Sequence, residues 1–170
     1  MKSMTRQNVP LSRRTLLGGA VALTVGLPTF GRTASGDPWA NAPQRRLTNA
    51  DWRARLPAAS YEVLRAEGTE RPFSSPLNDE HRRGVFQCRA CALPLFKSEW
   101  KYDSGTGWPS FNRALPGAIS KKSDFALGYP RTEYHCARCL GHQGHLFDDG
   151  PAPTGLRHCN NGVALSFTPS

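Results

Sequence analysis

The sequence predicts a mainly β domain, built from short strands and turns with few helices. The 170 residues include 16 glycines and 14 prolines, which from Gly68 onward recur too often to leave room for long helices. The segments Gly84–Cys88 and Val163–Phe167 have patterns typical of short strands. A chain of this length fits one domain that buries its own core. We expect this domain over residues 48–170, after a proline-bearing linker over residues 36–47.

Residues 1–35 are typical of an export signal. They hold five basic residues and no acid, and the pair Arg13-Arg14 precedes the apolar run TLLGGAVALTVGL and a few small residues. The run is too short and too rich in glycine to span a bilayer comfortably. The arginine pair is similar to the twin-arginine signature of bacteria, with Leu16 in place of the usual phenylalanine. We therefore expect export to the periplasm, cleavage shortly after Ala34 and no stable membrane insertion afterwards. The alternative is an uncleaved helix that rests on a membrane.

The exported part of the chain carries only a mild positive charge. The whole chain has a formal charge of +9, but without the first 35 residues the balance is 17 basic against 13 acidic residues. No basic run in this part exceeds two residues. Such a distribution gives little support to a nucleic-acid footprint or a polybasic membrane patch. We therefore expect no nucleic-acid partner.

Two short helices are expected before the β region. The run Thr48-Asn49-Ala50-Asp51 is a capping box that starts the first helix, and Pro57 ends it. The second helix is expected over Ala58–Glu67, with Gly68 as its C-terminal stop. Both helices are expected to clasp the domain and to take no part in chemistry.

Four of the five cysteines predict a metal site. Cys88-x-x-Cys91 and Cys136-x-x-Cys139 together offer four thiolates, and two such turns brought together make the tetrahedral sulfur cage that zinc prefers. A closed four-cysteine site is structural because it leaves no position open for a substrate. The alternative is two local disulfides in an oxidising compartment. Twin-arginine export favours the metal, because that route is associated with proteins that fold before they cross.

Cys159 has no cysteine partner and is therefore a candidate nucleophile. Arg157 and His158 precede it, and positive or ionisable neighbours stabilise a thiolate, which is the reactive form. Because a strand is expected from Val163, we place Cys159 at the entry to that strand. The alternative is a buried, inert cysteine.

His142 and His145 lie three residues apart, shortly after the second cysteine pair. They could bind zinc, but the four cysteines already fill a tetrahedral site. Acid/base work near Cys159 and structural hydrogen bonding remain open for both. Asp149 either orients part of this network or belongs to a solvated turn.

Six motifs, taken in order, resemble a methionine sulfoxide reductase of the B type, the family that acts on the R epimer of methionine sulfoxide. The motifs are GTERPF (68–73), CRACALPLF (88–96), DSGTGWPSF (103–111), CARC (136–139), GHLFDDGP (144–151) and TGLRHCNN (154–161). The resemblance covers nearly everything from Thr48 to Phe167. It implies a fold of two antiparallel sheets, the β-tent, tied by one structural zinc ion. The zinc ligands implied are Cys88, Cys91, Cys136 and Cys139.

The resemblance also implies the residues and the reaction of the site. Cys159 would be the catalytic cysteine, and the residues at the family's other active-site positions are Arg157, Asn161, His142, His145 and Trp108. Attack on sulfoxide sulfur needs a thiolate, a proton source for the departing oxygen and an apolar wall for the methyl group. Cys159, the histidine pair and Trp108 fit these roles. The expected activity is that of a peptide-methionine (R)-S-oxide reductase, acting on methionine sulfoxide in oxidised proteins.

Several residues depart from the family pattern. Leu140 and Gln143 replace a common glycine and an aliphatic residue, while His158 and Asn160 replace an aromatic and an aliphatic residue beside Cys159. These changes bear on substrate preference and on the pKa of the thiol.

Thr106 stands where many relatives keep a recycling cysteine. With four cysteines on zinc, the sulfenic acid formed at Cys159 would need an external thiol, either a thioredoxin-like domain or a small thiol. Two other functions compete with this one: a zinc-ribbon-like binding module without catalysis, and a thiol peroxidase that uses Cys159.

Overall fold

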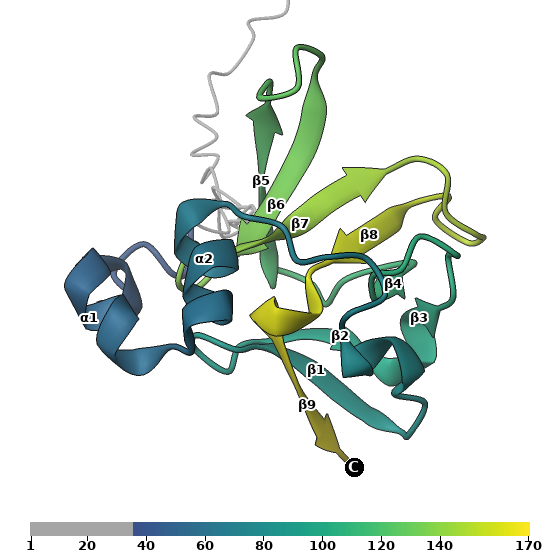
Figure 1. Cartoon of the computed structure of the whole chain (residues 1–170), viewed down its shortest axis with the longest axis horizontal. Helices are drawn as coiled ribbons and strands as arrows, with labels where there is room; N and C mark the ends of the chain where they lie inside the picture. Colours follow the sequence, from purple (N-terminus) through teal and green to yellow (C-terminus); the bar gives the residue numbers. More distant parts are fainter. Residues whose placement is uncertain (1–35) are drawn as a thin grey trace, which may run out of the picture. The chain divides into compact units, whose positions relative to one another are not determined.

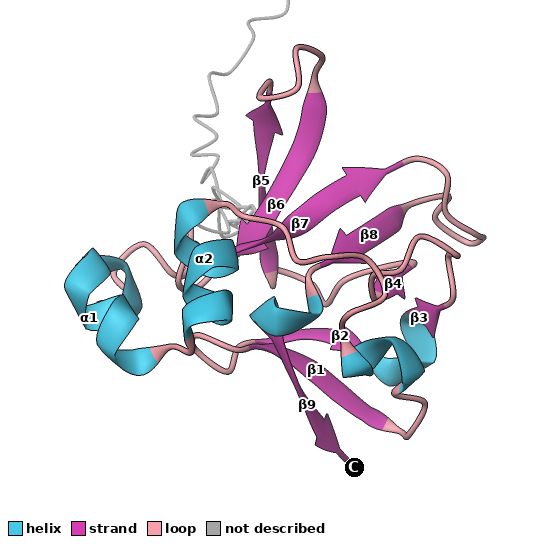
Figure 2. Cartoon of the chain, in the orientation of Figure 1, coloured by secondary structure: helices cyan, strands magenta, loops and turns pink. Residues whose placement is uncertain are grey.

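The computed structural model describes residues 36–170, so the expected export signal over residues 1–35 lies outside the described part. Two antiparallel sheets form the body of the domain, with the α-helices Asn49–Arg55 and Ala58–Ala66 on one side of them (Figures 1 and 2). The smaller sheet has the strand order β2-β1-β9 and the larger one β3-β4-β8-β7-β6-β5. The bounds of the strands are β1 Gly84–Cys88, β2 Pro94–Lys97, β3 Lys101–Tyr102, β4 Ser110–Phe111, β5 Ile119–Asp124, β6 Arg131–Cys136, β7 His142–Phe147, β8 Arg157–Asn160 and β9 Leu165–Pro169. The prediction of a mainly β domain with two antiparallel sheets and short N-terminal helices is confirmed.

Both expected helices form, and their ends follow the local sequence. Helix α1 (Asn49–Arg55) begins at the capping box, in which the Thr48 side chain accepts from the Asp51 N–H and the Asp51 side chain accepts from the Thr48 N–H. Helix α2 (Ala58–Ala66) buries Tyr61 and Leu64 on one face. The residue that caps its C-terminus in the left-handed conformation is Glu67, with φ of 56°. The helix therefore stops one residue before Gly68, where the stop was predicted.

Residues 36–47, expected as a linker, include the 3-10 helix Pro43–Arg46 and lie against the second cysteine turn. The Arg45 guanidinium donates to the carbonyl of Ala137 at 2.6 Å, and the Arg138 guanidinium stacks over Trp39 at 4.4 Å from the ring centroid. These contacts hold the segment before α1 onto the domain. Within residues 36–170, no helix has the length and apolar character needed to cross a membrane.

An aromatic core fills the space between the sheets. Phe96 of β2 stacks on Phe111 of β4 with ring centroids 4.1 Å apart, and Phe86 of β1 meets Phe111 edge-on at 5.0 Å. All three rings are fully buried. Because side chains alternate between the faces of a strand, this packing sends the neighbouring residues of the larger sheet to its other face.

The last strand differs from the prediction. Gly84–Cys88 forms a strand as expected, but Gly162–Ala164 is a 3-10 turn, and β9 runs over Leu165–Pro169. Cys159 therefore does not stand at the entry to that strand. It lies inside β8, between β4 and β7. The strand was not predicted because the residues around Cys159 are polar. His158 and Asn160 nevertheless turn to the buried face, where both form hydrogen bonds.

Candidate active site

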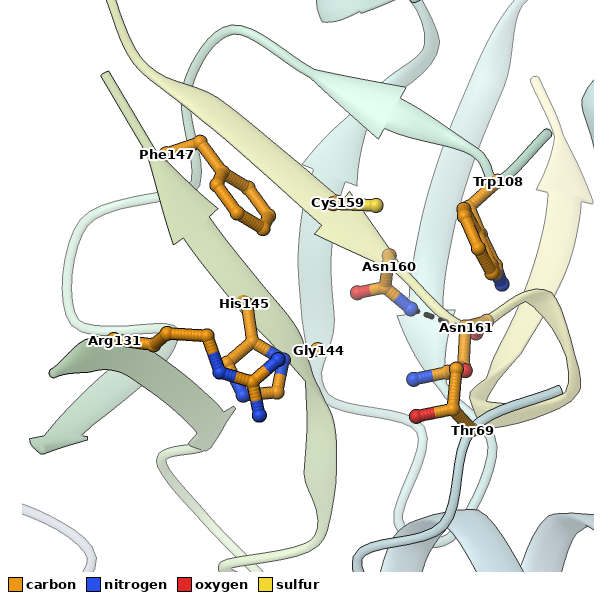
Figure 3. Close-up of a pocket in the computed structure, with 9 residues that line it drawn as sticks. All are labelled: Thr69, Trp108, Arg131, Gly144, His145, Phe147, Cys159, Asn160 and Asn161. Atoms are coloured by element: carbon orange, nitrogen blue, oxygen red, sulfur yellow. Dashed lines mark hydrogen bonds between the residues drawn. The ribbon is translucent and has the colours of Figure 1, made fainter. Parts of the chain in front are cut away.

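Cys159 opens into a pocket on the face of the larger sheet that points away from the aromatic core. The cavity has a volume of about 130 Å³ and is lined by Thr69, Trp108, Arg131, Gly144, His145, Phe147, Cys159, Asn160 and Asn161 (Figure 3). Cys159 pairs with His145 of β7 on one side and with Ser110 of β4 on the other. In Figure 3 the Cys159 thiol lies between the rings of Phe147 and Trp108. The thiol is thus held on a rigid central strand with aromatic rings on both sides.

A β-bulge places both candidate histidines on the face of the sheet that carries Cys159. The register between β6 and β7 shifts so that Tyr134 pairs with Gly144 and His135 with His142, which leaves Gln143 as the extra residue. Without the bulge, residues three apart on a strand would point to opposite faces. The two imidazole centroids of His142 and His145 lie 5.6 Å apart.

The two histidines differ in exposure. His145 lines the pocket beside Cys159, whereas His142 is 2% exposed and lies behind it, outside the pocket lining. Burial lowers the pKa of His142, and the Glu133 carboxylate offsets part of this effect. His145 is therefore placed for direct contact with a ligand in the pocket, and His142 for support.

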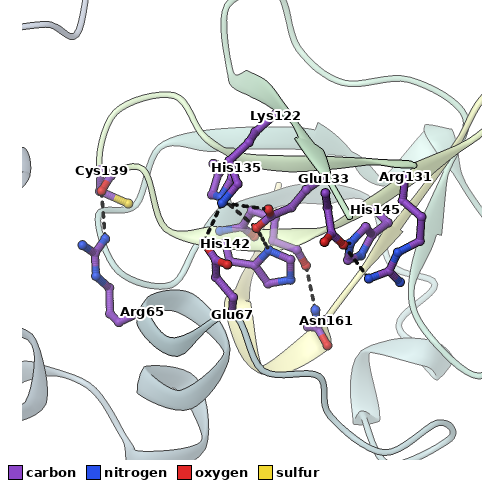
Figure 4. Close-up of polar contacts among 12 residues, drawn as sticks. Arg65, Glu67, Lys122, Arg131, Glu133, His135, Cys139, His142, His145 and Asn161 are labelled. Carbon is purple, nitrogen blue, oxygen red and sulfur yellow. Dashed lines mark hydrogen bonds and ion pairs between the residues drawn. The ribbon is translucent and has the colours of Figure 1, made fainter. Parts of the chain in front are cut away.

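Each histidine hydrogen bonds to a carboxylate from the neighbouring hairpin (Figure 4). His142 Nδ1 lies 2.5 Å from Glu133 Oε1, and His145 Nε2 lies 2.8 Å from Asp124 Oδ2. Arg131 pairs with the same Asp124 oxygen at 2.5 Å. Neither carboxylate was singled out in the sequence, because each comes from another strand and no local spacing links it to its histidine.

Arg157 supplies positive charge beside Cys159. Its guanidinium makes a two-point ion pair with Asp149, at 2.7 and 2.8 Å, and stacks over the Phe147 ring at 4.1 Å from the centroid. Burial raises the pKa of Cys159, while Arg157 and a hydrogen bond from Thr106 act in the opposite direction. Asp149, for which a turn role stayed open, thus orients Arg157. His158, in contrast, points into the aromatic core, with its ring 5.8 Å from Phe96 and 5.6 Å from Tyr134.

Asn161 and Trp108 are held in place by the segment at Glu70, which the sequence indicated only as part of a motif. The Trp108 indole N–H donates to the Glu70 carbonyl at 3.1 Å, and the Glu70 N–H donates to Asn161 Oδ1 at 3.0 Å. The Glu70 carboxylate accepts from the N–H groups of Gly162 and Val163. Glu70 therefore links Trp108 and Asn161, two of the residues that line the pocket.

The four cysteines of the C-x-x-C pairs converge on one point. Their sulfur atoms all lie within 4.8 Å of one another, with Cys88 to Cys139 at 3.6 Å and Cys91 to Cys136 at 3.4 Å. Four thiolates around zinc, with bonds of about 2.3 Å, would stand about 3.8 Å apart, whereas a disulfide needs about 2.0 Å. The short contacts also join one pair to the other. The residues present fit a four-thiolate metal, and all four thiols are free.

The comparisons with known proteins agree with this arrangement. The SelR domain family matches residues 56–169. A peptide methionine sulfoxide reductase MsrB from Agrobacterium fabrum is 47% identical over 129 residues, which is 75% of this chain and 96% of the relative. The MsrB of Thiobacillus denitrificans is 51% identical over 123 residues, covering 72% of this chain and 93% of the relative. The MsrB of Pseudomonas entomophila has the same identity over the same length, covering 72% and 94%.

The chain belongs to the MsrB family. The structure shows where the residues that depart from the MsrB pattern lie and what they contact. Leu140 follows the second C-x-x-C turn with φ of 58°, matching Ala92 after the first turn with φ of 56°, so both residues occupy the conformation in which glycine is easiest. Gln143 is the bulge residue, and its side-chain amide donates to Cys88 Sγ at 3.4 Å.

His158, one of the other departures, turns away from the MsrB pocket toward the core, whereas Asn160 lines the pocket and also hydrogen bonds into the core. His158 takes the place of an aromatic ring there, and burial lowers its pKa, so it is neutral. Asn160 Oδ1 accepts from the Tyr134 hydroxyl at 2.8 Å, which satisfies both buried groups. Both residues therefore change the packing beneath Cys159, and Asn160 also contributes to the lining of the pocket.

Proposed function

We propose that this protein is a peptide-methionine (R)-S-oxide reductase that acts on methionine sulfoxide in oxidised proteins. The observation that carries the proposal is Cys159, a lone thiol beside the Arg157 guanidinium at a pocket lined by Trp108 and Phe147. Membership of the MsrB family supports the same reaction.

In the proposed reaction the sulfur of Cys159 attacks the sulfoxide sulfur and takes over its oxygen. The thiol and the sulfoxide together yield a sulfenic acid and a thioether, so the single thiol proton ends on the transferred oxygen. His145 stands beside Cys159 and can move that proton. Arg157 stabilises the thiolate on the way, and the aromatic walls receive the methyl and methylene groups.

Turnover of the separated sulfoxide epimers with dithiothreitol tests the proposal. Loss of the R epimer alone is expected, and Cys159→Ser should abolish it while the protein stays folded and keeps its metal. Loss of neither epimer would leave the zinc-ribbon-like binding module as the better description. Reduction of hydrogen peroxide much faster than of sulfoxide would favour a thiol peroxidase.

A single zinc ion is the proposed occupant of the four-cysteine cluster, supported by the spacing of the sulfur atoms. The ion would join the Cys88 and Cys136 turns, which lie on different sheets. Metal analysis of the purified protein should return one zinc per chain. Substoichiometric zinc together with two disulfides would reject the site.

Recycling is proposed to use an external thiol, either a thioredoxin-like domain or a small thiol. If zinc holds four cysteines, the sulfenic acid at Cys159 has no partner within the chain, because Thr106 cannot form a disulfide. Excess substrate without reductant should yield one methionine per enzyme and a Cys159 adduct with dimedone. An intramolecular disulfide at Cys159 with release of zinc would show that a zinc ligand acts as the resolving thiol.

Export to the periplasm by the twin-arginine route is proposed from the sequence of residues 1–35. Cleavage should release a protein that begins between about residues 35 and 38, without a stable membrane anchor. Changing Arg13 and Arg14 to lysine should retain the protein in the cytoplasm. Periplasmic recovery of that double variant at the wild-type level would argue against the route.

A further inference from the structure

The two active-site histidines are each bound by a different carboxylate through a different ring nitrogen. Glu133 Oε1 lies 2.5 Å from Nδ1 of His142, and Asp124 Oδ2 lies 2.8 Å from Nε2 of His145. Figure 4 shows Glu133 beside His142, and the two carboxylates come from the hairpin strands β5 and β6 next to β7. Glu133 pairs across the sheet with His145, but its carboxylate contacts His142. His145 is therefore left to bond with Asp124, through its other ring nitrogen.

Both carboxylates are ionised and therefore can only accept hydrogen bonds. Burial alone raises the pKa of Glu133, but His135, Lys122 and His142 together outweigh burial and lower it. The pKa of Asp124 is lowered by the N–H of Ala126, by His145 and by Arg131.

An ionised acceptor dictates which nitrogen of a neutral imidazole carries the proton. His142 must carry it on Nδ1, and its Nε2, which is buried without a hydrogen-bond partner among residues 36–170, keeps a lone pair. His145 must carry it on Nε2, and its Nδ1 keeps the lone pair.

Glu133, His135 and His142 could also be taken for a metal site, since their ligating atoms lie within 4.8 Å of one another. The Lys122 ammonium lies 3.1 Å from Glu133 Oε2 and pairs with Glu67 at 2.8 Å. A cation thus already compensates the carboxylate, and a second one would be repelled. The cluster is better described as a hydrogen-bond network.

We propose that Glu133 and Asp124 are positioning residues that fix opposite tautomers on His142 and His145, so that each histidine presents an unprotonated nitrogen as a proton acceptor. The role rests on the proposed reductase function. With such acceptors at hand, the Cys159 proton passes to an imidazole as the sulfur attacks and from there to the sulfoxide oxygen. The proton balance closes without a solvent donor.

The tautomers can be read directly in the full chain labelled with ¹⁵N at histidine. The chain has five histidines, and His→Gln variants assign them. The nitrogen shifts should report a protonated Nδ1 at His142 and a protonated Nε2 at His145 in the wild type. The reverse assignment at either residue, or an imidazolium at both at neutral pH, would overturn the proposal.

Asp124→Asn and Glu133→Gln test the consequence for turnover. Each amide offers donor hydrogens beside its acceptor oxygen, so the ring nitrogen that formerly donated can now accept and the imidazole proton is free to move to the other nitrogen. We expect kcat to fall by about 10²-fold in each variant, because general acid/base catalysis contributes about 10² to 10⁴-fold. KM should change little, and only the histidine next to the substitution should change its tautomer.

The matched control is Glu80→Gln, which removes a partly buried carboxylate paired with Arg82 outside the pocket lining. It should keep both tautomers and the wild-type kcat. A wild-type kcat in Asp124→Asn or Glu133→Gln with an altered tautomer would refute the catalytic consequence. Failure of the wild type to reduce either sulfoxide epimer would instead refute the proposed function, and the nitrogen shifts would remain readable.

Discussion

Gly144→Ala should damage the enzyme by pushing apart the two strands that carry the pocket. Gly144 pairs with Asn160 across β7 and β8, and a Cβ added there would stand 1.9 Å from the Cys159 carbonyl oxygen. Ordinary contacts begin at 3.4 Å, so the two strands would have to separate by about 1.5 Å. The backbone that must move carries the reactive thiol.

The size of the effect follows from this displacement. Misplacing a reacting group by about 1 Å can cost about 10²-fold in rate, so kcat/KM should fall by about 10²-fold or more. Forcing an extra methyl group into packed structure costs about 1–3 kcal/mol, which corresponds to a fall in Tm of roughly 3–9 °C in a domain of this size.

Steady-state reduction of the R epimer and thermal unfolding, measured on the same preparation, provide the assay. Gly117→Ala is the control, because its added Cβ meets no atom of residues 36–170 within 4 Å although its φ is +67°. That control should lose about 1–2 kcal/mol from its left-handed backbone and keep its rate. A Gly144→Ala enzyme with both the wild-type rate and the wild-type Tm would show that β7 and β8 accommodate the added methyl group without moving Cys159.

Three further predictions concern the cysteines and their surroundings. Cys136→Ser should lose zinc and unfold, as seen by metal analysis and circular dichroism, because structural zinc binding is coupled to folding; a folded apoprotein would contradict this. Thr106→Cys should form an internal disulfide with Cys159 after one turnover, detectable by mass spectrometry, since Thr106 is close enough to that thiol to lower its pKa. Arg157→Gln should raise the pKa of Cys159 further by removing positive charge, so the acidic limb of kcat/KM and of iodoacetamide alkylation should move to higher pH. An unchanged limb would show that the guanidinium does not stabilise the thiolate.

Much of the chemistry could be predicted from the sequence, because it depends on residues that are close neighbours along the chain. Two C-x-x-C pairs leave Cys159 as the odd thiol, and the count holds whatever the fold. The capping box at Thr48 is equally local, since its two hydrogen bonds join residues three apart. The motif order was specific enough to identify the family and, through it, the two sheets.

The tertiary structure decided how these residues face one another. The bulge at Gln143 turns His142 and His145 to one face, and a bulge depends on the pairing partner, which no spacing within β7 reveals. Asp124 and Glu133 come from the adjacent hairpin, so their contacts with the histidines exist only once the strands pair. The same pairing places Cys159 inside a strand, because backbone hydrogen bonds to β4 and β7 outweigh the weak strand propensity of its polar neighbours.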